Sequence, residues 1–484
     1  MALFFQRDAT LQVYPLDASG NFPSASKAFA IPMLEGFSFS QSTNSSEITL
    51  SEMESTVGTS RRGRKMFNDS LAPVEWSFST YIRPYIAGDT AVTGSTISWA
   101  DEQVHLVDEC LWNALLSKSR IDLDGTSGTS VANITFSGGS GANAVGDVIT
   151  ATGGTLVSGY SHAQATVVSV DSNNITEVEI TRPGRYSVNP TGAGSNNSGT
   201  HNIGTPTFVM GEEGDSIIDR GTTKTVLSSK NSNVSALNTL NMEFMVSSNV
   251  GYKLNKAVVN SATINFDVEG IATIEWSGMA ATIDGITAFT AATGANSANA
   301  AINEGGTSAD TENFIRNRLT AMAVGVKTGG TSDGISTIKD DYDLTLTGGS
   351  ITIENNISYL TPEELGVVNK PIEHVTGVRN VGGSFTCYLA SNSTDTGSKD
   401  FYEDLTSAAA LDVITHDFEM IFKIGGSSGS PRLEVKMPQC HVEVPSHSIE
   451  DVISLESSFT SLQSDMESNI VDDLEVSIYG VALS

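Results

Sequence analysis

The sequence predicts a mainly β protein, and three observations support this prediction: a low charged fraction, short runs of alternating apolar and polar residues, and few helical patterns. Charged residues make up 17% of the 484 residues, against about 25% in typical globular domains. The polarity therefore comes mainly from Ser, Thr, Asn and 45 glycines. Disordered acidic chains are more densely charged and poorer in Val, Ile, Phe and Tyr, so a folded chain is expected, with about three domains at roughly 150 residues each.

Three segments show the alternation most clearly: 37–41, 75–82 and 262–268. Each places apolar residues on one face of a strand and Ser, Thr or Asn on the other. The runs 165–170 and 175–180 flank Asp171–Asn174, a turn-forming segment, and predict a β-hairpin.

Helical patterns occur twice. Between Asp101 and Lys118, apolar residues recur at three- and four-residue spacing, which predicts an amphipathic helix. A shorter helix is predicted from Lys399 to Leu405. Trp76, Trp112 and Trp276 fall on patterned faces and are expected in the core, and Trp99 is expected to pack before the first helix.

The charge balance excludes several classes of function. The chain has 56 acidic and 26 basic residues and a formal net charge of −30. A general nucleic-acid binder needs a basic surface, and an anionic membrane repels an acidic one. No apolar run of about 18 residues predicts a membrane-spanning helix, and the apolar start is too short for a signal peptide, so synthesis in the cytosol is expected.

The chain also repeats itself, with the order of the matches preserved. Residues 38–44 match 350–356 at an offset of 312, and residues 77–82 match 384–389 at 307. The pairs 112–115 with 402–405 and 262–266 with 440–444 follow at offsets of 290 and 178. The offset falls by 112 between the last two pairs (290 − 178), so the first copy is expected to carry an insertion of about that length.

This repeat predicts five segments. They are a first domain in two parts (1–119 and 236–279), an inserted glycine-rich β module (120–235), a linker (280–310) and a second domain (311–484). Insertions are tolerated at exposed loops, so the module is expected outside the shared core.

Motifs that carry chemistry are weak. Gly425–Gly429 fits the GxSxG pattern around Ser427, but a turn and a strand are predicted after it where a nucleophile elbow needs a helix. His441 and Glu443 would share one face of a strand and resemble two metal ligands. Cys440 occupies the position of Ala262 in the repeat, so it is expected in the core, facing opposite to His441, and this favours a structural strand.

Asp122 and Asp124 lack the later ligands of an EF-hand. The three cysteines, Cys110, Cys387 and Cys440, lie far apart and predict neither disulfides nor a zinc site. No phosphate-binding loop or dinucleotide fingerprint occurs, so we expect no catalytic, cofactor-binding or metal-binding residues.

Three longer segments resemble the major tail tube proteins of T5-like long-tailed bacteriophages. They are 67–71 followed by 75–81, then 262–278, then 348–362. They lie in both repeats, in the order that this family shows. The resemblance implies two tandem tail-tube-type β-sandwich or barrel domains, each with a flanking helix. The chain shows no immunoglobulin-like module near Asp472–Val476, and the insertion at 120–235 is expected to be the outward decoration.

The resemblance further implies an assembly. Three chains would form a ring of six pseudo-equivalent domains, rings would stack into a hollow tube in the virion tail, and assembly would take place in the host cytoplasm. The tube would hold a tape-measure protein, contact tail terminator and distal tail or baseplate proteins, and conduct double-stranded DNA to the host without inserting into a membrane. A ring would carry −90 charges (3 × −30), which would repel DNA and keep it moving.

The resemblance also gives a role to the one dense basic run, Arg61, Arg62, Arg64 and Lys65. It lies in the long loop that this family uses for ring-to-ring contact. Residues 441–484 hold nine acidic residues and no Lys or Arg, so Asp472 and Asp473 are expected to meet the basic run across stacked rings. A solvated loop or a phosphate contact are the alternatives for the basic run.

Two other functions stay open from the sequence. A virion fibre or adhesin-type protein would bind a host receptor through the inserted module. A secreted hydrolase would use Ser427 as its nucleophile.

Overall fold

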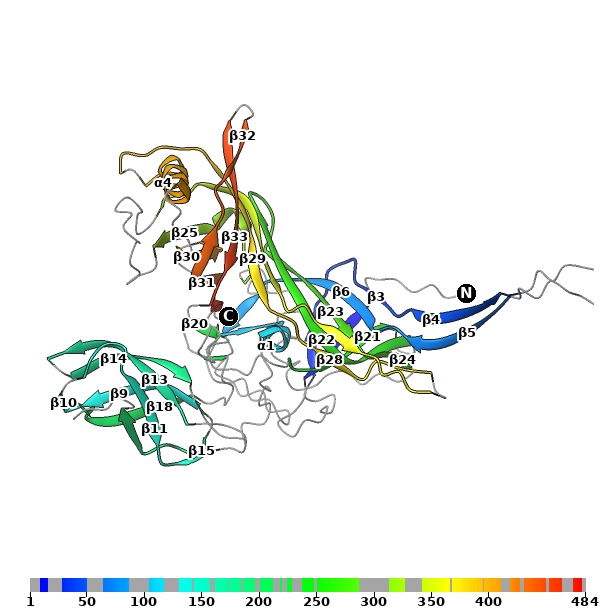
Figure 1. Ribbon diagram of the computed structural model, residues 1–484, viewed down its shortest axis with the longest axis horizontal. Helices are drawn as coiled ribbons and strands as arrows, with labels where there is room; N and C mark the ends of the chain where they lie inside the picture. The colour runs from blue at the N-terminus through cyan, green and yellow to red at the C-terminus, as the bar shows by residue number, and fades with distance from the viewer. Residues whose placement is uncertain are drawn as a thin grey trace, which may run out of the picture.

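The computed structural model is dominated by one large antiparallel sheet of 18 strands (Figure 1). The residues that the structure describes are 9–15, 28–49, 64–86, 104–116, 130–141, 143–156, 162–172, 174–182, 184, 186–195, 201–211, 218–219, 224–228, 237–247, 250–286, 313–326, 342–365, 368–394, 396–410, 418–426, 431–449, 452–463 and 473–480. The predicted mainly β class is confirmed. Neither helix in this part of the chain is long and apolar enough to cross a membrane.

Six strands of the first repeat pair in the order β1–β21–β22–β23–β6–β3. Their bounds are β1 Thr10–Pro15, β21 Leu240–Ser247, β22 Val250–Asp267, β23 Thr273–Ala280, β6 Val74–Tyr81 and β3 Ser38–Ser40. Strand β2, Phe29–Ile31, also pairs with β1, and β24, Thr282–Ile286, with β22. The strands predicted at 37–41, 75–82 and 262–268 are therefore confirmed.

The same succession occurs again in the second half as β25–β30–β31–β33–β29–β26. Their bounds are β25 Ala321–Val326, β30 Phe418–Ile424, β31 Arg432–Val442, β33 Ile453–Ser461, β29 Asn380–Tyr388 and β26 Leu346–Glu354. Strand β32, Ser446–Ile449, continues β31 along β33, and β34, Glu475–Tyr479, pairs with β31 as β24 pairs with β22.

The strand registers reproduce two of the sequence offsets and shift a third. Ser77 pairs with Ser38, and Ser384 pairs with Ser350, which gives offsets of 307 and 312 again. In the first repeat, Ser77 pairs with Ser277, and Ser277 pairs with Ser261. In the second repeat, Ser384 pairs with Ser458, and the backbone oxygen of Ser458 accepts from the Glu443 N–H. The late strands therefore align at 443 − 261 = 182, four residues from the predicted 178. A shift by an even number keeps every side chain on the same face, so alternation alone does not distinguish the two registers.

The two repeats are joined into one sheet by β22 and β26. Ser261 to Asp267 pair antiparallel with Glu354 to Gly348. This seam continues the sheet from β6 and β23 of the first repeat to β29 and β33 of the second (Figure 1).

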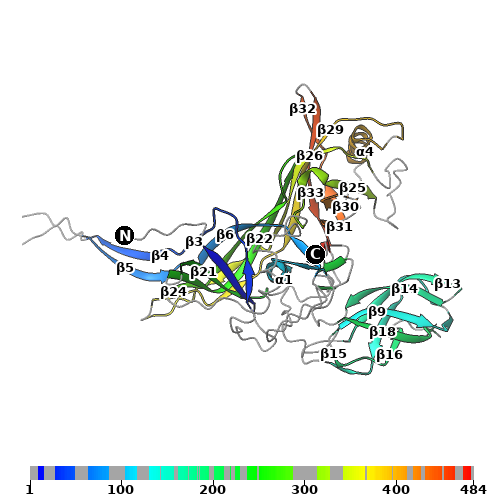
Figure 2. The ribbon, with the colours of Figure 1, turned by 180° about the vertical axis from the view of Figure 1, so that it is seen from behind.

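Two hairpin arms leave the same end of the sheet. The first arm pairs β4, Thr43–Thr49, with β5, Arg64–Leu71, and the second pairs β27, Ser358–Leu360, with β28, Glu373–Val375. The arms lie side by side, because the Asn369 carbonyl accepts from the Leu71 N–H at 2.8 Å (Figure 2).

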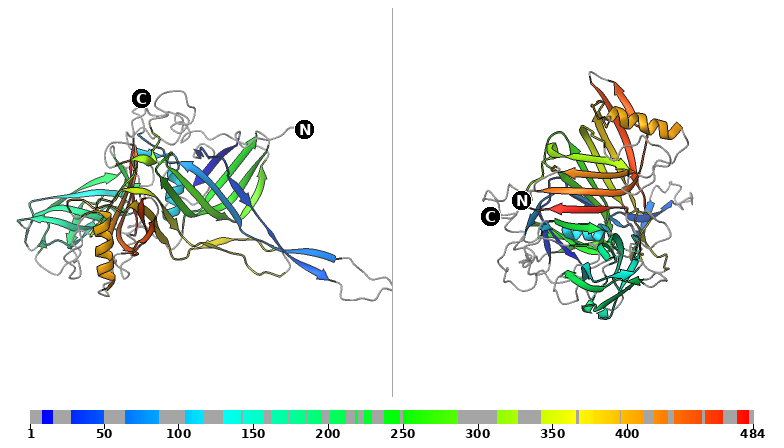
Figure 3. Two further views of the ribbon diagram at one scale, coloured as in Figure 1. Left: turned by 90° about the horizontal axis from the view of Figure 1, so that it is seen from above. Right: turned by 90° about the vertical axis from the view of Figure 1, so that its left-hand side faces the viewer.

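A separate set of small sheets is built from residues 130–211 (Figure 3). Its strands include β9 Ser130–Ser137, β10 Ser140–Gly141, β11 Val148–Thr152, β12 Thr155–Leu156, β13 Gln164–Asp171, β14 Asn174–Arg182, β15 Tyr186–Val188, β16 Gly192–Ser195, β17 His201–Asn202 and β18 Thr205–Gly211. The hairpin predicted around Asp171–Asn174 is confirmed as β13–β14. Two clusters of buried side chains, one around Val131, Ala165 and Tyr186 and one around Ile149 and Val167, form its own core.

Three strands of the large sheet fall inside ranges predicted as the insertion or the linker. Strand β20, Lys224–Ser228, lies inside the range predicted for the insertion but pairs with β34, because Thr225 and Leu227 are buried in the large sheet. The short strand β19, Ile218–Asp219, pairs with β20. Strand β24 falls inside the range predicted as a linker.

The first predicted helix is shorter than expected. Helix α1 covers Glu109–Leu116, and the preceding residues form β8, Val104–Leu106, which pairs with β7, Pro84–Ile86. All eight residues of α1 are buried, so the helix lies inside the core rather than on the surface. Val104 and Leu106 of β8 contributed to the apolar spacing that predicted a longer helix, because this strand is buried at every position.

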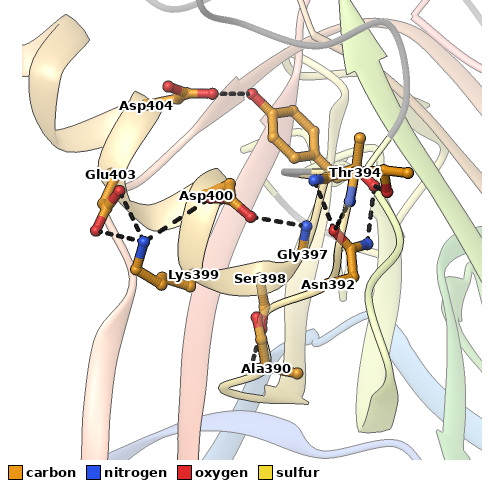
Figure 4. A network of polar contacts seen from close by, with 11 residues as sticks. Ala390, Asn392, Thr394, Gly397, Ser398, Lys399, Asp400, Glu403 and Asp404 are labelled. Atoms are coloured by element: carbon orange, nitrogen blue, oxygen red, sulfur yellow. Dashed lines mark hydrogen bonds and ion pairs between the residues drawn. The ribbon is translucent and has the colours of Figure 1, made fainter.

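Helix α4, Ser398–Ala410, extends the predicted second helix at both ends. A polar network fixes its first turn (Figure 4). The Asp400 carboxylate accepts from the Gly397 N–H at 3.1 Å, and the Ser398 hydroxyl donates to the Tyr388 carbonyl at 2.6 Å. The Tyr342 hydroxyl donates to Asp404 at 2.8 Å and joins the helix to the preceding chain. A short 3₁₀ turn covers Asn317–Leu319.

The apolar core runs through both repeats under the large sheet. Trp76, Trp112 and Trp276 are buried in it, as predicted, and Trp112 packs edge-on against Trp276. Cys110, Cys387 and Cys440 are buried free thiols, so burial raises the pKa of all three. Trp99 lies outside the described residues.

Candidate functional site

The face of the large sheet that points away from the apolar core is polar along both repeats. In β6, β23 and β33 buried residues alternate with accessible ones, as period-two patterning requires. The accessible positions are occupied mainly by Ser, Thr and Glu. Because β22 and β26 join the repeats, this polar face is continuous from β3 to β33.

Hydroxyl groups form cross-strand ladders on this face. Ser38 and Ser77 share a hydrogen bond of 2.9 Å, and Ser261 and Ser277 share one of 2.8 Å. Across the seam, the hydroxyls of Thr263 and Thr352 lie 3.3 Å apart. Cross-strand pairs of this kind stabilise a sheet and fix its register.

The charge of the polar face is negative. Its carboxylates are Glu75, Asp267, Glu275, Glu354, Glu443 and Glu456. Strands β3, β6, β23, β26, β29 and β33 contain no Lys or Arg. On these six strands Glu75, Glu275, Glu354 and Glu456 therefore act together as a field of one sign, whereas β22, which carries Asp267, also contains Lys253 and Lys256.

A buried polar chain lies beneath the polar face. The Trp276 indole N–H donates to the Thr80 hydroxyl at 3.0 Å, and that hydroxyl donates to Asp108 at 3.0 Å. Burial raises the pKa of Asp108 to about 7, and the hydrogen bond from Thr80 opposes this shift. The neighbouring Glu109 contacts His105 at 3.2 Å, with both side chains buried. These buried groups lie inside the first repeat, at the start of α1.

The seam between the repeats is held by contacts at the C-terminal end of α1. The Asn355 side chain donates to the Leu115 carbonyl at 2.8 Å, and the Arg379 guanidinium donates to the Leu116 carbonyl at 3.4 Å. Arg379 also forms a bidentate ion pair with Asp473, with its Nε 2.9 Å from the carboxylate. Side chains of the second repeat thereby satisfy helix carbonyls of the first, which otherwise have no intrahelical partner.

Sequence reasoning did not identify Asn355 or Arg379. A signal was present: Arg379 is the single cation between Lys370 and Lys399 in a strongly acidic half of the chain. An isolated cation in such a segment is a candidate for a buried pair.

The two outer edges of the polar face are unpaired among the described residues. Strand β3 pairs with β6 alone, and β32 pairs with β33 alone. These edges occupy the positions that β26 and the end of β22 occupy at the seam. Open edges present unpaired backbone N–H and C=O groups and invite pairing with another chain.

The residues predicted to stack rings are only partly within the described chain. Lys65 is exposed on β5, where Arg64 begins the strand; Arg61, Arg62 and Asp472 lie outside the described residues. Asp473 is buried, and its carboxylate is paired with Arg379 of its own chain.

The candidate chemical motifs gain no support where the structure describes them. Gly425 and Gly426 follow β30 and lead into β31, so the motif joins two strands; Ser427, Asp122 and Asp124 lie outside the described residues. Cys440 is buried while His441 is exposed, so they face opposite sides as predicted. No group of three potential metal ligands occurs among the described residues.

A relative with a known role matches most of the chain. The chain is 24% identical over 438 residues to the tail tube protein pb6 of Escherichia phage T5, and the match covers 90% of this chain and 68% of that protein. The resemblance to the tail tube proteins of T5-like phages is confirmed. No family model matches the chain.

Proposed function

We propose that this chain is a structural subunit of a phage tail tube, in which three copies close into a ring and rings stack into a hollow tube that conducts DNA. The observation that carries the proposal is the seam between the repeats. One repeat already pairs with the next through β22 and β26, and the two equivalent edges have no strand partner among the residues that the structure describes. The same pairing between chains would close the sheet.

The repeat offsets specify this contact between chains. At the seam, Ser261 pairs with Glu354 and Asp267 with Gly348. Adding 182 to the first member converts Ser261 to Glu443, and subtracting 312 from the second converts Glu354 to Ser42. One extra residue lies between Glu443, opposite Ser458, and Ser446, opposite Glu456, so 263–266 correspond to 446–449 at an offset of 183. Glu443 of one chain would therefore pair with Ser42 of its neighbour, and residues 446–449 would pair antiparallel with residues 40–37. Ring closure removes both edges, which would otherwise promote aggregation.

The polar face would then line the lumen. Its six carboxylates would recur three times in every ring. Double-stranded DNA carries about one charge per 1.7 Å of its axis, so cationic walls would hold it, whereas carboxylates repel it. Hydroxyl ladders leave a smooth surface of short side chains. This chemistry supports transport without binding.

The proposed domain organisation assigns 1–119 and 236–279 to the first tube domain and 311–484 to the second. The module within 120–235 would lie outside the tube wall, and 280–310 would connect the domains. A tape-measure protein would fill the lumen before DNA passes, and tail terminator and distal tail or baseplate proteins would close the ends. The protein would be located in the virion tail, after assembly in the host cytoplasm.

A second candidate function is receptor binding by the inserted module, since residues 130–211 have their own buried core. Deleting 130–211 from the full chain distinguishes the two functions. A tube subunit without the module should still form rings and tubes in electron micrographs, whereas an adhesin should lose binding to host cells. Failure of the intact purified chain to form rings or tubes would contradict the proposed function.

A further inference from the structure

The end of β6 in the first repeat is covered by a segment that leads into the second repeat. The Ile315 carbonyl accepts from the Ala272 N–H at 2.9 Å, and Arg316 forms an antiparallel bridge with Ile271. The Ile315 side chain is fully buried in the apolar core. Residues 313–319 precede β25, so the second repeat closes this end of the first.

The preceding residue, Phe314, extends this contact. Its ring packs edge-on against Tyr81 with centroids 5.3 Å apart, and the Arg83 guanidinium lies 4.4 Å from its centroid. Arg83 also donates to the Asn313 side chain at 3.2 Å. The segment is therefore fixed by apolar, aromatic and polar contacts together.

Strand registers identify the same place in the second repeat. Ser77 and Ser277 pair as Ser384 and Ser458 do, which gives offsets of 307 (384 − 77) and 181 (458 − 277). Tyr81 then corresponds to Tyr388, Ile271 to Val452 and Ala272 to Ile453. A hydrogen bond repeats as well, because the Ile82 N–H donates to the Ala272 carbonyl and the Leu389 N–H to the Ile453 carbonyl.

Apolar side chains are exposed at this second place. Ala272 is fully buried, whereas Ile453 is 38% exposed, and Val452 is 58% exposed. With Tyr388 and Ile449, which pairs with Ile453, these residues form a group that we name the tip patch. Exposed apolar groups of this kind mark interaction sites.

The duplication indicates what covers the tip patch. Pro15 of β1 pairs with Leu240, and Val326 of β25 pairs with Phe418. Leu240 and Phe418 begin β21 and β30, and the register shifts directly after each of them. The segments that precede β1 and β25 therefore correspond at an offset of 311 (326 − 15).

This offset converts 314–318, Phe-Ile-Arg-Asn-Arg, to 3–7, Leu-Phe-Phe-Gln-Arg. Both segments begin with two apolar residues and end with an amide residue followed by Arg. Residues 3–7 lie outside the described part of the chain.

We infer that residues 3–7 of one chain dock on the tip patch of its neighbour in the same ring. The inference rests on the proposed ring, in which the first repeat of one chain adjoins the second repeat of the next. Figure 1 shows β3 and β32 on opposite sides of the molecule, so the first repeat beside the tip patch belongs to another copy. Phe4 takes the place of Ile315, and Phe5 lies opposite Val452 as Arg316 lies opposite Ile271.

Cross-linking of the full chain tests this placement. Phe5→Cys with Val452→Cys should react with a short bifunctional thiol reagent and give covalent dimers and trimers on a denaturing gel, since residues opposite each other are about 5 Å apart at Cβ. Ile271→Cys with Arg316→Cys is the positive control, because it occupies the same register within one chain and should give a cross-linked monomer. Phe5→Cys with Val145→Cys, 68% exposed in the module, is the negative control.

A second variant, Phe4→Asp, measures what the contact contributes. We expect it to raise the protein concentration needed for ring formation by about tenfold or more, because the lost contact recurs three times in each ring. Val145→Asp should match the wild type.

Wild-type rings establish the assembly before either variant is compared. If these rings form, then an internally cross-linked monomer from Phe5 and Val452, cross-linking no stronger than that of the Val145 pair, or an unchanged concentration for Phe4→Asp would overturn the inference. Absence of rings in the wild-type protein would instead contradict the proposed function.

Discussion

Replacing Arg379 by Met should destabilise the seam between the repeats strongly. The Arg379 and Asp473 side chains are 9% and 6% exposed, and the guanidinium also donates to the last carbonyl of α1. Removing the cation leaves the Asp473 carboxylate buried without its charge partner. Breaking a buried pair in this way costs about 3–5 kcal/mol.

A double-mutant cycle separates this penalty from the net contribution of the pair. The variant Arg379→Met with Asp473→Leu removes both charges, so it should be less destabilised than Arg379→Met alone, with a coupling of about 2 kcal/mol or more. The matched control is Lys399→Met, because Lys399 is 51% exposed and its ion pair with Glu403 is worth about 0.5 kcal/mol or less.

The assay is urea unfolding of the full chain followed by tryptophan fluorescence. Trp76, Trp112 and Trp276 are buried in the first repeat, and Trp112 lies on α1 itself. Tryptophan fluorescence from the first repeat should therefore report a loss of stability that is caused by a substitution in the second repeat. Additive effects of the two substitutions, or a cost of Arg379→Met no larger than that of Lys399→Met, would refute this account of the seam.

Three further predictions concern the interior and the polar face. Burial raises the pKa of Asp108 from 3.8 to about 7, so the folded chain keeps a proton that the unfolded chain releases, and stability falls as pH rises through this window. Asp108→Asn should match the wild type near pH 4 and unfold at higher urea at pH 8, by up to about 4 kcal/mol; equal differences at both pH values would contradict this. Gly278→Ala should cost about 1–3 kcal/mol in the same assay, because an added Cβ would overlap the Val258 carbonyl and the Trp76 ring, whereas Gly285→Ala has open space and should be mild. Changing Glu75, Glu275 and Glu354 together to Lys should leave ring formation unchanged but slow DNA release from assembled virions; unaltered release would count against a repelling lumen.

Much of the strand pattern was predictable because one face of each strand is buried. The alternation in 75–82 and 262–268 reports directly which side chains enter the core. The duplication was visible for the same reason, since both repeats place small polar residues on the opposite face. Trp76, Trp112 and Trp276 followed from their positions in these patterns.

The register of the late strands and the burial of helix α1 were harder to predict from the sequence. A shift of four residues in the late strands preserves every face, so Cys440 matches either Ala262 or Val258 without conflict. Helix α1 is buried on all sides, and Asp108 stands directly before its first residue, Glu109, as is favoured at a helix start. The apolar residues Val104 and Val107 fit the helical spacing although they precede this start, so the spacing alone placed the start too early.

The candidate site was predictable in chemistry but not in geometry. The acidic balance indicated repulsion of DNA, whereas the six carboxylates that share the polar face could be identified only from strand pairing. Asp473 illustrates the limit: it belongs to an acidic run, yet the fold buries it against Arg379, which is 94 residues away. Charge density along a sequence does not show which members of a run reach the surface.

Cross-linking across the proposed ring contact tests the central claim most directly. Ser42 and Glu443 are exposed and would lie opposite each other in neighbouring chains, whereas Val188, also exposed, belongs to the module. The variant with Ser42→Cys and Glu443→Cys should react with a short bis-thiol reagent to give covalent dimers and trimers on a denaturing gel and nothing larger. Native Cys110, Cys387 and Cys440 are buried and should not react. The pair Ser261→Cys with Glu354→Cys is the positive control, because it occupies the same register within one chain and should give a cross-linked monomer. Monomers alone from the Ser42 and Glu443 pair, or equal cross-linking from Ser42→Cys with Val188→Cys, would contradict ring closure through these edges.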